Sequence, residues 1–188
     1  MNHSVGVLLI VVTVVMVLLG VAAHYYSNQR RTKLLRRHFG PEYDRVVRQK
    51  RNVRQAEGVL EFREKAREAL QIRPLPRSDQ IAYARRWNEV QRQFVDDPQQ
   101  ALMQADRMLN DVMAARGYPV LNFEEQAEIV SVDYPVLVQH YRMAHEITLR
   151  RNTGRSSTEE LRKAVVHYRS LFDELLKDSL IDRKEARE

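Results

Sequence analysis

Histidines and one pair of adjacent carboxylates are the side chains in this sequence that could support metal binding or acid–base catalysis. His140 and His145 lie five positions apart, which separates them by about 140° around a helix of ~3.6 residues per turn. Two histidines that share a metal on one helix face are three or four positions apart. The spacing therefore argues against a metal site and favours surface or core histidines.

Asp96 and Asp97 are the adjacent carboxylates. Paired carboxylates can act as general acid and general base, but that chemistry needs a pocket around them. Asp97 precedes Pro98 and Gln100, an arrangement typical of a helix N-terminus that the aspartate caps. We therefore expect Asp97 to cap one helix and Asp96 to end the helix before it.

No other motif of catalysis or cofactor binding is present. The chain has no cysteine, which excludes thiolate chemistry and disulfides. It contains no glycine-rich phosphate loop, no Gly-x-Ser-x-Gly turn and no His-Glu-x-x-His sequence. We predict no catalytic residue, no cofactor and no metal ligand.

An apolar segment near the N-terminus decides where the rest of the chain lies. Residues Val5 to Ala23 carry no charge and would extend about 28 Å as a helix, close to the ~30 Å hydrocarbon core of a bilayer. Apolar side chains occupy every face of such a helix, which is unlike a helix packed on the surface of a soluble domain. We predict a transmembrane anchor within residues 1–26.

The charges beside this segment predict its orientation. Met1 to Ser4 contain no lysine or arginine. The basic residues that follow the segment most closely are Arg30, Arg31, Lys33, Arg36 and Arg37. Positive charge resists translocation, so we expect the N-terminus outside and the body in the cytoplasm. The alternative is an exported protein with a cleaved signal peptide, because Val21-Ala22-Ala23 would suit a signal peptidase.

The same five cations are candidate contacts for anionic lipid headgroups, since each Lys or Arg near such a surface contributes about 1 kcal/mol. Basic residues continue to Arg54, and Arg45 to Arg54 would reach the membrane only if the chain turned back toward it near Gly40. The net charge of +6 arises from this basic segment. The near-neutral remainder argues against a nucleic-acid partner.

Helix-capping residues and apolar residues at helical spacing recur through the rest of the sequence, which predicts an all-α protein. Pro41 opens a helix expected from Glu42 to Leu70, and two prolines then interrupt the pattern. The predicted parts are a transmembrane helix (1–26), basic stalk helices (27–70), a hinge (71–77), a cytoplasmic bundle of four or five helices (78–180) and a charged tail (181–188). A turn is expected at Asn152-Thr153-Gly154. A strand over residues 129–138 is a minor alternative, which Pro135 opposes.

Several short motifs carry a resemblance to a known group of proteins. They are FGPEYDR (39–45), IRPL (72–75), FVDDP (94–98), RGYP (116–119) and HYR with LF (167–169, 171–172). With them the chain resembles an uncharacterised family of small bacterial single-pass membrane proteins, generally described as hypothetical or secreted. The resemblance implies a helical domain behind an N-terminal anchor, which places the expected membrane as a bacterial inner membrane, and it carries over no activity. The family often has a more acidic second helix than this chain.

These observations lead to two hypotheses of different kinds. The first is a membrane-tethered, non-enzymatic interaction or adaptor module, whose partners are the lipid bilayer and an unidentified protein. The second is a small-ligand-binding or enzymatic helical domain whose site forms between helices. The first is favoured because helix-building signals are strong and no chemical constellation accompanies them.

Overall fold

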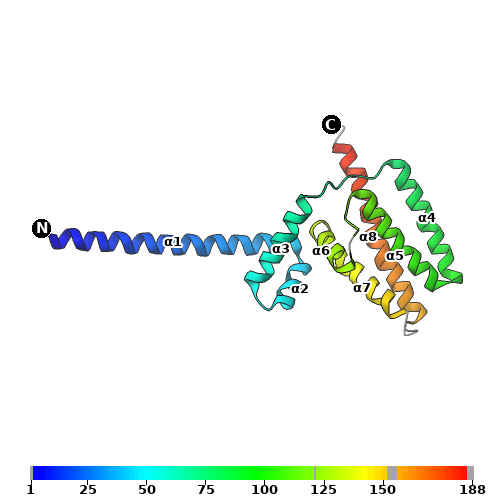
Figure 1. Ribbon diagram of the computed structural model, residues 1–188, viewed down its shortest axis with the longest axis horizontal. Coiled ribbons are helices and arrows are strands. Elements are labelled where there is room, and N and C mark those ends of the chain that lie inside the picture. Colours follow the sequence, from blue (N-terminus) through cyan, green and yellow to red (C-terminus); the bar gives the residue numbers. More distant parts are fainter. Residues whose placement is uncertain (1, 121, 152–155, 186–188) are drawn as a thin grey trace.

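The computed structural model describes residues 2–120, 122–151 and 156–185, with side chains at 15–120, 122–150 and 156–177. These residues form helices and no strands, which confirms the all-α prediction. The helices are α1 (Asn2–Phe39), α2 (Pro41–Lys50), α3 (Val53–Glu68), α4 (Arg77–Asp96), α5 (Pro98–Arg116), α6 (Phe123–Asp133), α7 (Leu137–Arg151) and α8 (Thr158–Glu185). Most of α1 projects away from a body formed by the other helices (Figure 1).

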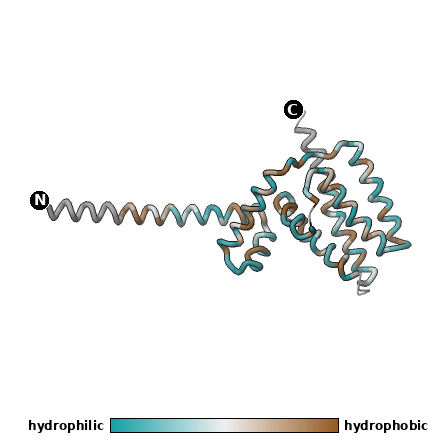
Figure 2. Tube along the Cα trace, in the orientation of Figure 1, coloured by the Kyte–Doolittle hydropathy of each residue, from teal (hydrophilic) through white to brown (hydrophobic). Residues whose placement is uncertain are grey.

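Figure 2 shows a hydrophobic stretch in the middle of the projecting helix α1, followed by a hydrophilic stretch nearer the body. The large side chains of α1 from Val15 to Val21 are between 48% and 66% exposed. Among the helices as far as the structure describes them, none is long and apolar enough to cross a bilayer. The predicted segment Val5–Ala23 lies only in part among the described side chains, because residues 5–14 fall outside them.

The chain reverses twice after α1. Gly40 adopts φ 47° and ψ −120°, a conformation suited to glycine, and Pro41 then begins α2. Arg51 takes a left-handed conformation (φ 54°) and the Asn52 side chain accepts a hydrogen bond from the Gln55 backbone N–H, so α3 begins as a separate helix. The prediction of one helix from Glu42 to Leu70 was therefore wrong, because Asn52 acts as a helix cap.

Two hydrophobic cores result from this arrangement. The smaller core joins α1, α2, α3 and one residue of α6, and its buried members are Leu35, Phe39, Tyr43, Val46, Ala56, Leu60 and Val132. The larger core lies among α4, α5, α6, α7 and α8. Trp87 of α4 stacks on Phe172 of α8 in this core, with ring centroids 4.6 Å apart.

Several predicted helix boundaries are confirmed. Asp97 accepts a hydrogen bond from the Gln100 backbone N–H at 3.0 Å and caps α5. Gly117 ends the same helix with φ 98°. Residues 129–138 fall in α6, α7 and their connection, so the alternative of a strand was wrong. The turn expected at Asn152-Thr153-Gly154 lies outside the described residues.

The predicted break between α3 and α4 is also present, and it packs against the body. Leu75 is buried, and the Arg73 backbone N–H donates to the Arg116 carbonyl at 2.8 Å. A Cβ added to Gly117 would lie 2.5 Å from the Gln71 carbonyl oxygen. Glycine is therefore required at residue 117 both by its φ angle and by the approach of this segment.

We predict opposite stability changes for alanine at two glycines. Gly58 lies inside α3, where an added Cβ meets no atom within 4 Å, so Gly58→Ala should raise the free energy of unfolding by about 0.5–1 kcal/mol. Gly117→Ala should lower it by about 2 kcal/mol or more, because of backbone strain and the Gln71 clash. Urea denaturation of the full chain in detergent, followed by circular dichroism, measures both. A stabilised Gly117→Ala variant would contradict the described packing.

Candidate functional site

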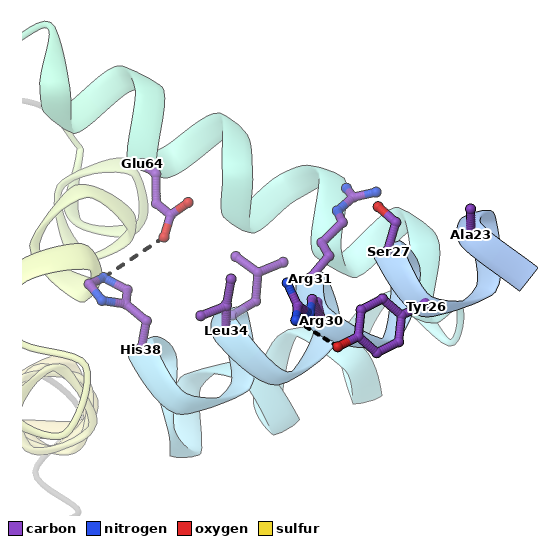
Figure 3. Close-up of a pocket in the computed structure, with 9 residues that line it drawn as sticks. Ala23, Tyr26, Ser27, Arg30, Arg31, Leu34, His38 and Glu64 are labelled. Atoms are coloured by element: carbon purple, nitrogen blue, oxygen red, sulfur yellow. Dashed lines mark hydrogen bonds and ion pairs between the residues drawn. The ribbon is translucent and has the colours of Figure 1, made fainter.

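Helix α3 runs beside α1 in the same direction. Thr32 donates a hydrogen bond to the Glu57 carboxylate at 2.6 Å. Farther along both helices, His38 Nε2 lies 4.0 Å from the Glu64 carboxylate (Figure 3). The residue numbers of the partners rise together, so the start of α3 lies beside the part of α1 that is closest to the apolar segment.

The carboxylate of Glu42, within the FGPEYDR motif, holds this reversed arrangement together. Glu42 is fully buried at the start of α2. It accepts hydrogen bonds from Arg45 at 2.7 and 2.8 Å and from Arg63 of α3 at 2.8 Å. Gln139 of α7 donates to it at 2.6 Å, and Arg142 of α7 lies 3.6 Å away. One carboxylate therefore joins α2, α3 and α7.

The ionisation of Glu42 follows from these contacts. Burial raises the pKa of its carboxyl group, because a charge is poorly solvated inside a protein. The hydrogen bonds and positive charges of Arg45, Arg142 and Arg63 outweigh that effect, so the net pKa is lowered. Glu42 is thus an anion held by cations, which is a structural role and unlike that of a general acid.

Two arginines of α3 connect the small core to the bundle. Arg63, which is 1% exposed, donates to Glu128 of α6 at 2.6 Å as well as to Glu42. Arg67 donates to both oxygens of Asp133 at 2.8 Å. Tyr118 donates to the same carboxylate at 2.5 Å. The junction between α3 and α6 is therefore built largely from ion pairs.

The five predicted lipid contacts divide into two groups. Arg31 pairs with Glu61 and lies 4.0 Å from Glu57, and Arg36 pairs with Asp44 at 3.4 Å. Arg30 lies over the Tyr26 ring, 4.4 Å from its centroid, and donates to the Tyr26 hydroxyl. Lys33 and Arg37 are exposed and have no side-chain partner within the described part of the chain. The cations free of carboxylates are therefore Arg30, Lys33 and Arg37.

A groove of about 760 Å³ runs along α1 and is also lined by Glu64 of α3; of the five cations, Arg30 and Arg31 line it. Figure 3 shows Ala23 and Tyr26 at one end and His38 with Glu64 at the other. Leu34 and Leu35 contribute apolar surface between them. The groove combines apolar and basic side chains, which is chemistry suited to an amphiphile.

The residues considered for catalysis or metal binding lie apart from this groove. Asp97 serves as a cap, and Asp96 is exposed at the end of α4. His145 stacks on Phe123 with ring centroids 3.5 Å apart, whereas His140 lies 5.0 Å from His167 of α8. No group of three or more His, Asp or Glu side chains among the described residues could hold a metal ion.

Burial affects two of these histidines. It lowers the pKa of His145, and it lowers the pKa of His167 together with the nearby His140. Burial therefore favours the neutral form of both imidazoles, as expected for packed side chains.

Comparison of the chain with known protein families, with curated proteins and with solved structures gives no match. The resemblance to small bacterial single-pass membrane proteins stays a prediction.

We predict that Glu42→Gln lowers the free energy of unfolding by about 3 kcal/mol, because the buried Arg63 would lose its charged partner. Urea denaturation in detergent measures the change. Glu89→Gln is the matched control: Glu89 pairs with Arg92 on an exposed helix face, so its loss should change stability by about 0.5 kcal/mol or less. Equal losses for the two variants would contradict the role of Glu42.

The dependence of the free energy of unfolding on pH gives a second measure of what the Glu42 carboxylate contributes to stability. The folded pKa of Glu42 lies below its ordinary value of 4.5. Its contribution to stability is therefore complete above that pH and is lost as the pH falls through the folded pKa. Glu42→Gln should lose less stability than the native chain below pH 4.5. If the free energy of unfolding of Glu42→Gln and of the native chain fell equally as the pH was lowered, the stabilising role of the Glu42 carboxylate would be contradicted.

Proposed function

We propose that the protein is a membrane-tethered, non-enzymatic helical interaction module, anchored by α1 with its body in the cytoplasm. The main support for this proposal is the distribution of apolar and basic side chains along α1. A single helix bears exposed apolar side chains from Val15 to Val21 and enters the body through its basic end. An uncovered apolar surface of this kind is stabilised by a lipid environment.

The flank of α1 supports the proposed orientation. Arg30, Lys33 and Arg37 follow the apolar segment and have no carboxylate partner among the described residues. Because their charges are not neutralised by the protein, they can oppose translocation and contact anionic headgroups. Arg31 and Arg36 have structural partners, so we assign them a smaller part in lipid contact.

The body supports a role in binding another protein. Phe62 of α3 is 71% exposed. It lines a groove between α3 and α6 together with Ala66 and Ile129, and the other three lining residues are charged. An exposed aromatic side chain in a groove of apolar and charged residues is suited to a protein contact.

We predict that a reporter active only in the cytoplasm is active when fused after Glu188, and that a reporter active only in the periplasm is inactive there. The chain with its uncleaved N-terminus should stay in the membrane fraction after carbonate extraction. Removing the three unpaired cations (Arg30→Gln, Lys33→Gln, Arg37→Gln) should produce a fraction of inverted chains, because orientation depends on charge near the span.

The matched control removes three exposed arginines far from the segment, Arg77, Arg85 and Arg107, and should leave orientation unchanged. An active periplasmic reporter together with cleavage before His24 would contradict the anchor and favour the exported protein.

A further inference from the structure

We propose that the turn between α2 and α3, residues 48–54, is a second membrane contact that binds anionic phospholipid headgroups. This inference rests on the proposed anchoring through α1. We call residues 48–54 the basic turn. Its cations are Arg48, Lys50, Arg51 and Arg54.

The length of α2 places the basic turn near the membrane. Phe39 lies about 24 Å beyond Ala23 along α1, at ~1.5 Å per residue. Helix α2 then reverses direction over 10 residues and returns about 15 Å of that distance. Measured along the α1 axis, the basic turn should therefore lie about 9 Å beyond the end of the apolar segment, comparable to the ~8–10 Å over which charges attract one another at physiological salt.

The contacts of the turn agree with this position. Val53 and Arg54 line a hollow together with His24 and Asn28 of α1. His24 follows Ala23 directly. The fold therefore places the basic turn beside the first residues after the apolar segment, a position that the sequence alone could not decide.

The charge of the basic turn is not neutralised by the protein. All four of its cations are exposed, and none has a side-chain partner in the part of the chain that is described. The carboxylates of α2 and of the first turns of α3 already have other partners: Glu42 pairs with Arg45 and Arg63, Asp44 with Arg36, and Glu57 accepts hydrogen bonds from Thr32 and Tyr43. The turn therefore presents four unpaired positive charges to any anionic surface near it.

An exposed apolar residue lies among these charges. Val53 is 47% exposed at the start of α3. Tyr25 and Tyr26 of α1 are 65% and 58% exposed at a similar level, where tyrosine rings favour the membrane interface. Cations around a small apolar tip fit a lipid surface, in which headgroup phosphates lie above acyl chains. Anchor and turn together would fix the tilt of the body.

The test uses the full chain in nanodiscs. Because the chain has no cysteine, Gln49→Cys gives a single labelling site on the exposed side of the basic turn, and Ala82→Cys on α4 gives a control site in the bundle. Energy transfer from a fluorophore at each site to an acceptor on lipid headgroups reports proximity. We compare discs of phosphatidylcholine alone with discs that also contain phosphatidylglycerol.

Transfer from the Gln49→Cys site should rise about twofold in the anionic discs and fall back at 1 M salt, where the Debye length is about 3 Å. The site in α4 should change little. A charge variant (Arg48→Gln, Lys50→Gln, Arg51→Asn, Arg54→Gln) should lose the rise; asparagine is chosen at residue 51 because it tolerates the left-handed conformation. The matched control replaces four other exposed arginines and should keep the rise in energy transfer; they are Arg73, Arg77, Arg85 and Arg107.

The possible failures are distinguishable. Equal transfer in both kinds of disc, from a chain that has inserted, would overturn the inference and leave the anchor intact. A rise that persists in the charge variant or at high salt would also overturn it. A chain that does not insert would overturn the proposed function and this inference together. The salt titration uses the native turn sequence, so it decides the question even if the charge variant fails to fold.

Discussion

The buried Glu42 carboxylate is the interaction on which the arrangement of this protein depends. It is fully buried, and it satisfies Arg63, a side chain that would otherwise be a buried cation without enough partners. Gln139 and Arg142 bring α7 to the same carboxylate. Such a cluster contributes specificity as well as stability, because a different packing of α2 and α3 would leave buried charges unpaired.

This constraint explains how the basic segment becomes divided. By drawing α2 back against α3, the Glu42 cluster places Glu57 and Glu61 beside Arg31. These ion pairs neutralise part of the positive charge of the basic segment. The cations of the basic turn stay exposed at the end of α2 and the start of α3. The fold thus separates cations that pair with carboxylates from cations that have no side-chain partner in the described part of the chain.

Much of the fold, but little of the site, could be predicted from the sequence. Prolines and glycines act locally, so the helix break at Gly40 and the cap at Asp97 could be predicted, whereas the direction that the chain takes after Gly40 could not. The break at Asn52 was missed because no proline or glycine marks it. The hydrogen-bond partners of Glu42 lie up to 97 positions away along the chain, and no local pattern shows that Arg63 is buried. For the same reason, Arg31 and Arg36 could not be distinguished from the unpaired cations beside them.

The chain turns back after α1, so that α3 runs beside α1 in the same direction and its start lies nearest the apolar segment. Pairs of spin labels on the otherwise cysteine-free chain measure this directly by electron–electron double resonance. We expect a shorter distance for Arg37→Cys with Lys65→Cys than for Arg37→Cys with Arg54→Cys, because Glu64 lies beside His38 whereas Arg54 lies near Asn28. One unbroken helix from Glu42 to Leu70 that returned along α1 would place Lys65 about 16 Å farther from Arg37 than Arg54 is. The reverse order of the two distances would therefore contradict the described fold.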